Sequence, residues 1–126
     1  FRGEEWRTQK ETQRLLDKYF TTKPNGIPGN DDTGTMSAWA IFNMIGFYPD
    51  CPGLPEYTLT TPVFNKVTIR LDPKWYKEKE LVIESNRTQP GTLYINKVLL
   101  NGKKFNQYRI THDELAHSQR ILFDLK

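Results

Sequence analysis

The sequence of 126 residues predicts an α+β fold in which two helices precede an antiparallel β-sheet or sandwich region. Residues 4–20 lack proline and glycine, and residues 36–45 are apolar and end at a glycine, so both segments indicate helices. From residue 66 onward, Val67, Ile69 and Leu71 alternate with polar residues, which is the pattern of a half-buried strand. The irregular, proline-rich segment 49–62 lies between the two patterns. We therefore expect a helical part, residues 1–50, and a β-part, residues 51–126.

The first helix is expected to bury one end more than its middle. Trp6, Leu16 and Phe20 can share one face, whereas residues 7–14 are entirely polar. The pattern therefore predicts little burial in the middle of this helix. Residues 23–26, Lys-Pro-Asn-Gly, form a turn cluster after it.

The second helix is expected to begin near residue 36, where the hydroxyl of Thr33 or Thr35 can cap it, and to end at Gly46. Only Ser37 and Asn43 interrupt its apolar residues. A helix that is apolar nearly all round must be buried nearly all round. One neighbouring helix and a small sheet cannot cover it. We therefore expect either further layers from the rest of a longer parent chain or a dimer of this chain.

The β-part is expected to contain at least five antiparallel strands. Residues 81–83, 93–100, 104–110 and 121–125 are strand-like, and Asn101-Gly102 is a strong signal for a hairpin between two of them. Residues 111–114 predict one capped helical turn.

The bulk composition excludes some classes of function. The net charge is +3 and the lysines are scattered, so the clustered basic stripe typical of nucleic-acid binding is absent. No apolar run approaches the ~20 residues that span a bilayer. Cys51 is the single cysteine, so no internal disulfide can form.

The strongest candidate site is the acidic loop between Gly29 and Gly34. Its residues Asn30, Asp31 and Asp32 precede a helix, whose N-terminus stabilises negative charge. The two adjacent carboxylates repel, so we expect the pKa of one to be raised. An ionised carboxylate here can act as a general base on water. The alternative is that Asp32 only caps the helix. An EF-hand calcium loop fits the spacing poorly.

Other candidates are weaker. His112 and His117 have no convincing Ser or Cys partner and are interpreted as surface residues. Residues 86–88, Asn-Arg-Thr, match a glycosylation pattern that is frequent by chance. Four aromatic residues are candidates for a sugar platform, although core packing explains each one singly: Tyr48, Tyr57, Trp75 and Tyr76.

Several segments together resemble glycoside hydrolase family 92, the exo-acting α-mannosidases. The resemblance is densest in the acidic loop, Gly-Asn-Asp-Asp at 29–32 with Gly34, in Met-Ser-Ala-Trp at 36–39, and in Gly-Phe-Tyr-Pro at 46–49. Residues 52–53, 57, 61–64, 66–69, 100–103, 110–112 and 115 continue it at lower density. It covers nearly the whole chain.

This resemblance implies a calcium-dependent enzyme that removes terminal α-linked mannose with inversion at the anomeric carbon. The expected linkage is α-1,2. It also implies an N-terminal β-sandwich, an (α/α)6 barrel and a C-terminal β-region. The present chain would supply the last barrel helices and that β-region. By position, Asp32 carries the general-base role, with Asp31 or Asn30 holding the water or the sugar.

The same resemblance places the general acid, a Glu, and most calcium ligands upstream, so the isolated chain is expected to be inactive. Its expected partners are mannose-containing glycans and the rest of the parent chain. Its expected location is secreted, periplasmic or at the cell surface. The alternative is a non-catalytic carbohydrate-binding or scaffold module.

Overall fold

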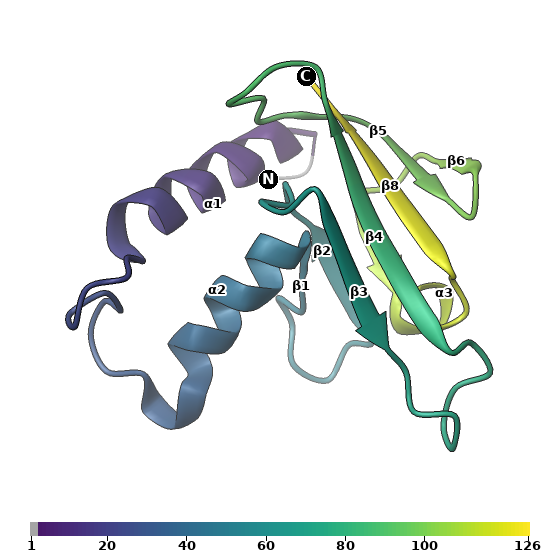
Figure 1. Ribbon diagram of the computed structural model, residues 1–126, viewed down its shortest axis with the longest axis horizontal. Coiled ribbons are helices and arrows are strands. Elements are labelled where there is room, and N and C mark those ends of the chain that lie inside the picture. Colours follow the sequence, from purple (N-terminus) through teal and green to yellow (C-terminus); the bar gives the residue numbers. More distant parts are fainter. Residues whose placement is uncertain (1–2) are drawn as a thin grey trace.

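The computed structural model describes residues 3–126 and confirms the α+β class (Figure 1). Two longer helices lie beside two β-sheets, and a third, short helix lies near the end of the chain. The helices are α1 (Glu5–Tyr19), α2 (Thr35–Ile45) and α3 (His112–Ala116), with a 3-10 turn η1 (Asp32–Gly34) before α2. No helix of the described part is long and apolar enough to cross a membrane.

The strands form a three-stranded sheet, in the order β1-β2-β7, and a five-stranded sheet, in the order β3-β4-β8-β5-β6. Their bounds are β1 (Phe47–Tyr48), β2 (Glu56–Leu59), β3 (Lys66–Arg70), β4 (Glu80–Arg87), β5 (Ile95–Leu100), β6 (Lys103–Phe105), β7 (Arg109–Thr111) and β8 (Arg120–Leu125). The expected strands around residues 66–70, 81–83, 95–100 and 121–125 are therefore confirmed.

Three details of the strand prediction were wrong. First, β8 inserts between β4 and β5 and runs parallel to β4, so the larger sheet is mixed. Second, the expected return strand 104–110 is split, because β6 stays with β5 while β7 crosses to pair with β2. Third, the proline-rich segment 49–62 contains strand β2. Each choice of partner is made by tertiary packing, which a local alternation pattern does not report.

The hydrophobic core lies between the two sheets. Phe123 of β8 has no exposed surface, and Ile83 of β4 and Ile110 of β7 are 1% exposed. Strand β8 thus lies at the centre of both the larger sheet and the core. The remaining buried members come from both sheets and from α3: Phe47, Leu59, Leu81, Ile95, Val98, Leu115, Ile121 and Leu125.

Helix α2 leaves apolar surface uncovered within this chain, as its sequence predicted. Only Ala40 and Asn43 are buried, whereas Ile41 is 54% exposed. The helix ends at Gly46 as expected, with φ 118° and an amide that donates to the carbonyl of Phe42. A Cβ at Gly46 would lie 3.2 Å from that of Pro62, so both the backbone angle and the close approach require glycine.

The middle of α1 departs from the prediction that it buries little. Gln9 is 3% exposed, and its side-chain oxygen accepts a hydrogen bond of 3.0 Å from the amide of Ile95. This bond joins residues 86 positions apart and ties α1 to the start of β5. A buried polar side chain with a long-range partner is invisible to a periodicity argument, which scores glutamine as a solvent-facing residue.

The Gln9 contact gives a stability test. In a chain that contains these residues, Gln9→Ala leaves the amide of Ile95 without its partner, and should cost about 1–3 kcal/mol of unfolding free energy. Gln13→Ala on the same helix is the matched control, because its only side-chain bond is an exposed one to Asp17. It should change stability by less than about 0.5 kcal/mol. Denaturant unfolding measures both, and equal values for the two variants would contradict the assigned role of Gln9.

Candidate active site

The acidic loop enters helix α2 through two consecutive residues with left-handed backbone angles. Thr33 has φ 56° and Gly34 has φ 83°. The N-cap residue is Gly34, which has no side chain that could bond to the helix. The expectation that Thr33 or Thr35 caps α2 was therefore wrong. A β-branched residue in this region is strained, and such strain gathers at functional sites.

Asp31 lies just before α2, and its carboxylate accepts hydrogen bonds from the first turn of that helix. Its carboxylate accepts a 2.7 Å bond from the amide of Ser37 and a 2.6 Å bond from the hydroxyl of the same residue. Its carbonyl also accepts from the amide of Thr35 at 2.9 Å. These three contacts hold the loop against the helix N-terminus. The capping role considered for Asp32 thus belongs to Asp31.

Hydrogen bonding sets the ionisation of Asp31. The side chain and then the amide of Ser37 lower the pKa of this carboxyl below its ordinary value. The repulsion expected between neighbouring carboxylates therefore does not raise the pKa of this member of the pair. Asp31 is held as an anion whose two oxygens each accept a hydrogen bond from Ser37.

Asp32 presents the opposite arrangement. Its backbone is fixed, because its carbonyl accepts 2.6 Å bonds from the hydroxyls of both Thr33 and Thr35. Its side chain is exposed, and among residues 3–126 the carboxylate makes no hydrogen bond. Asn30 is also exposed. The loop therefore anchors one carboxylate and offers the next to solvent.

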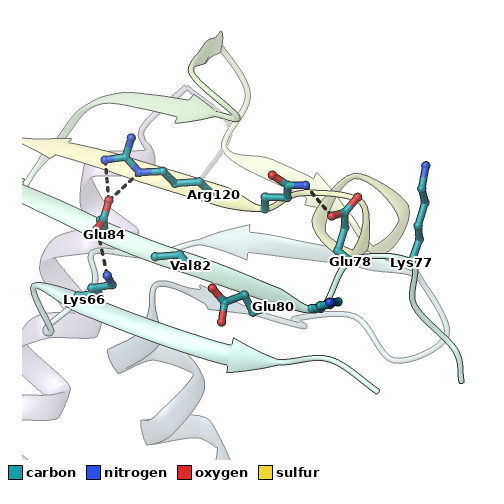
Figure 2. A pocket seen from close by; sticks show the side chains of 9 residues that line it. Lys66, Lys77, Glu78, Glu80, Val82, Glu84 and Arg120 are labelled. Atoms are coloured by element: carbon teal, nitrogen blue, oxygen red, sulfur yellow. Dashed lines mark hydrogen bonds and ion pairs between the residues drawn. The ribbon is translucent and has the colours of Figure 1, made fainter. Parts of the chain in front are cut away.

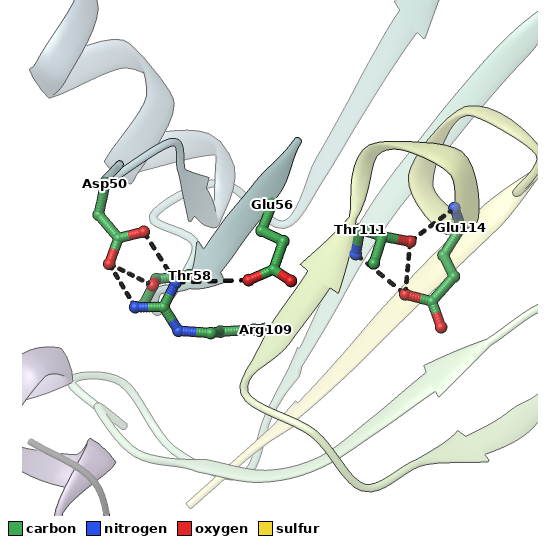
Figure 3. Close-up of polar contacts among 6 residues, drawn as sticks. All are labelled: Asp50, Glu56, Thr58, Arg109, Thr111 and Glu114. Atoms are coloured by element: carbon green, nitrogen blue, oxygen red, sulfur yellow. Dashed lines mark hydrogen bonds and ion pairs between the residues drawn. The ribbon is translucent and has the colours of Figure 1, made fainter. Parts of the chain in front are cut away.

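A second acid near the helices is committed to an ion pair. Asp50 accepts two bonds from the guanidinium of Arg109, at 2.7 and 3.1 Å, and one from the hydroxyl of Thr58 (Figure 3). Glu56 lies 3.7 Å from the same guanidinium. This cluster joins the loop after β1 to strands β2 and β7. Because the Asp50 carboxylate is paired with Arg109, it is not available as a second catalytic acid in this arrangement.

The outer face of the larger sheet carries the most highly charged hollow, about 630 Å³ in volume. Figure 2 shows that part of this charge is paired: Glu84 lies 2.6 Å from Arg120 and 3.8 Å from Lys66, whereas no dashed line reaches Lys77 or Glu80. Glu78 accepts a bond from Gln119. Paired, solvent-facing charges on adjacent strands are typical of sheet surfaces. We interpret this hollow as a solvated face.

The four candidate aromatic residues do not gather into one platform. Tyr48 packs edge-on against Trp39 beside α2. Tyr57 and Tyr76 instead both lie near His112, with ring centroids 6.1 and 6.2 Å from that of the imidazole. The four are therefore divided between the helices and the end of the sheets.

The capped turn at residues 111–114 is confirmed. Thr111 and Glu114 exchange bonds in a capping box at the start of α3 (Figure 3). This box fixes the backbone at which His112 leaves strand β7. His117 follows α3 directly, and its ring contacts Asp113.

No group of three or more His, Cys, Asp or Glu side chains that could hold a metal ion occurs among residues 3–126. In the acidic loop the side chains of Asp32 and Asn30 are exposed, whereas each carboxylate oxygen of Asp31 accepts a bond from Ser37. Oxygen donors suit calcium, but it takes six to eight of them. The loop therefore supplies only some of the oxygen ligands that a calcium site needs.

The family model described as the catalytic domain of glycosyl hydrolase family 92 matches residues 1–126. The chain belongs to this family. The match extends over both the helical part and the β-part, so the two sheets are included in what defines the catalytic domain.

Solved structures of the same family share this fold. An α-mannosidase from Bacteroides thetaiotaomicron, solved in complex with mannoimidazole, superposes with a TM-score of 0.87 at 31% identity over 98% of this chain. An inverting mannosidase of the same bacterium gives 0.82 at 36% identity over 97%. The chain spans 16% of the length of each.

A curated relative comes from a fungus. An uncharacterized secreted glycosidase of the fungus Arthroderma benhamiae is 30% identical over 104 residues, which are 82% of this chain and 13% of that protein. The likeness is again confined to a small part of a much longer protein.

The Asp31–Ser37 contact can be tested by titration. Because hydrogen bonding lowers the pKa of Asp31 in the folded state, it stabilises the fold above the ordinary aspartate pKa. This stabilisation is lost as the pH falls through the lowered value. Ser37→Ala removes one donor, so the titration midpoint of the Asp31 carboxyl carbon in NMR should rise.

Ser37→Thr retains a hydroxyl and should leave that midpoint low. Ser118→Ala is the matched control, because its hydroxyl bonds to the carbonyl of Glu114 in the β-part. An unchanged midpoint in Ser37→Ala would show that Ser37 does not hold the carboxylate.

Proposed function

We propose that this chain is part of an α-mannosidase that hydrolyses terminal mannose from glycans with inversion. We expect the enzyme to act on α-1,2 linkages. The observation that carries the proposal is the acidic loop, in which the backbone of Asp32 is tied by two hydroxyls while its carboxylate stays free. Family membership supports the reaction class. The mannosidase activity of two structural relatives supports the choice of sugar.

The proposed roles divide the acidic loop. Asp32 is the general base and takes a proton from the water that attacks the anomeric carbon. Asp31 holds the loop on the N-terminus of α2 through Ser37. Asn30, exposed beside them, is available to hold the water or a sugar hydroxyl. In an inverting glycosidase the base and the acid lie roughly 6.5–9.5 Å apart, with the water between base and sugar.

In this proposal, the general acid lies in a part of the enzyme outside this chain. Under the same proposal, α1 and α2 are the last helices of an (α/α)6 barrel, and residues 51–126 are the β-region that follows it. The uncovered apolar surface of α2, including Ile41, supports packing against further helices. An active site that needs both halves leaves residues 1–126 alone inactive.

A secreted, periplasmic or cell-surface location follows from the same proposal. The fungal relative, which is described as a secreted glycosidase, supports this location. Dimerisation of the fragment remains the alternative explanation for the apolar face of α2.

The base assignment is tested in the full-length parent enzyme. Asp32→Asn should lower kcat by at least ~10²-fold, the scale of a lost general base, with a smaller change in KM. Its melting temperature should hold, because the carboxylate has no partner in the described residues. Asp31→Asn is the contrasting variant and should lower the melting temperature, since it disturbs both bonds to Ser37.

NMR of the first-formed product should show the β-anomer, as inversion requires. Wild-type turnover in Asp32→Asn would contradict the assignment of Asp32 as the general base. A first-formed α-anomer would contradict the inverting mechanism.

Calcium dependence is a separate test. We expect a chelator to abolish activity of the parent enzyme and added calcium to restore it, because bound calcium would polarise and orient sugar hydroxyls. Since residues 3–126 hold no group of three or more His, Cys, Asp or Glu side chains that could bind a metal ion, most ligands would come from elsewhere in the parent. Full activity after exhaustive chelation would contradict the requirement.

A further inference from the structure

We infer that the cavity beside Trp75, Tyr76 and His112 is a second carbohydrate site, which takes the ring of a neutral hexose. The cavity measures about 370 Å³, within the range of roughly 300–1,000 Å³ typical of small-molecule sites. It lies where the loop between β3 and β4 meets the start of α3. The remaining lining residues are Pro55, Lys77, Thr111, Asp113, Ala116 and His117.

Aromatic surface is available on one wall. Trp75 is 72% exposed, the most exposed large apolar residue of the described chain. The ammonium of Lys74 lies 4.9 Å from the centroid of its ring, over one face. Because Trp75 is exposed and lines the cavity, an aromatic face is accessible to a ligand there. The C–H groups of a pyranose ring pack well on such a face, and this accounts for a solvent-facing tryptophan better than core packing does.

His112 lines the same cavity as Trp75, and its ring is held by a neighbouring side chain. The hydroxyl of Tyr57 shares a 2.9 Å hydrogen bond with Nδ1 of His112. Burial, and secondarily the nearby Tyr76, raise the pKa of Tyr57, so its hydroxyl stays protonated. With Nδ1 occupied, Nε2 of His112 is the ring nitrogen left to meet a sugar hydroxyl.

The charges of the cavity select a neutral ligand. Lys77 and Asp113 are the two lining residues with a fixed charge, and they have opposite signs. Asp113 also lies 3.3 Å from the ring of His117. A phosphate or a carboxylate would meet one lysine and one aspartate, without the cluster of cations that recognises such groups. A polyhydroxylated, uncharged ring matches this mixture of aromatic faces and single polar groups.

The choice of a sugar rests in part on the proposed function, because a glycan hydrolase meets its ligands as repeated sugar units. A second site holding a neighbouring branch would raise the effective concentration of the substrate at the first. The expected consequence is a lower KM for large glycans and no effect on small substrates.

The experiment uses the full-length parent enzyme. Crystals are soaked with methyl α-mannoside, methyl α-glucoside and methyl β-galactoside, and binding is measured by calorimetry. At least one sugar should lie against Trp75, and Trp75→Ala or His112→Ala should weaken its binding at least tenfold. Trp6→Ala on α1 is the matched control for an exposed tryptophan, at 46% exposure, and should leave binding unchanged.

Kinetics provides a second readout. Trp75→Ala should leave kcat/KM on p-nitrophenyl α-mannoside unchanged and raise KM on a branched mannan several-fold. Three results would overturn the inference: no sugar in the cavity, equal affinity in Trp75→Ala, or another segment of the parent filling the cavity. A sugar bound against Trp75 in a parent without mannosidase activity would retain this site and overturn the proposed function instead.

Discussion

The placement of the acidic loop depends on how the C-terminal end of α2 is fixed to the strands. The carbonyl of Gly46 accepts from the amide of Thr60 at 2.9 Å, and the carbonyl of Met44 accepts from the amide of Val63 at the same distance. The hydroxyl of Thr60 bonds to the carbonyl of Asn43. These bonds satisfy carbonyls that a helix end leaves without partners. The helix is thereby attached at one end to the β-core, and it carries the loop at its other end.

At that other end, the neighbouring side chains Asp31 and Asp32 are chemically identical and differ only in their surroundings. The left-handed angles of Thr33 and Gly34 turn the chain so that Asp31 faces the first turn of α2 while Asp32 faces away. One carboxylate stabilises the helix N-terminus, where negative charge is favourable. The other has its backbone fixed and its side chain unused. Under the proposed function this is economical, because the positioning group and the reacting group are neighbours on one short loop.

Local signals in the sequence predicted local structure well and long-range choices poorly. The Asn101-Gly102 turn has φ 49° and 80°, as a tight hairpin demands, and the capping box at Thr111 follows from its side chain. By contrast, insertion of β8 beside β4 and the burial of Gln9 depend on partners many residues away. The acidic loop was found from its residue types. Which of its carboxylates is free could not be, because this depends on two backbone angles that no composition rule supplies.

The attachment of α2 makes the β-region part of the proposed catalytic geometry. A helix of 11 residues is about 16 Å long, so a tilt of about ten degrees at its attached end would move the loop by about 3 Å. Displacements of about 1 Å can cost a hundredfold in rate when a reacting group must be aligned. A side chain at position 46 would meet Pro62 and Phe123, so a substitution of Gly46 is expected to shift α2 and, at its other end, the Asp32 carboxylate. Under the proposed function, the two sheets carry neither acid of the catalytic pair and contribute by holding the helix that presents the proposed base.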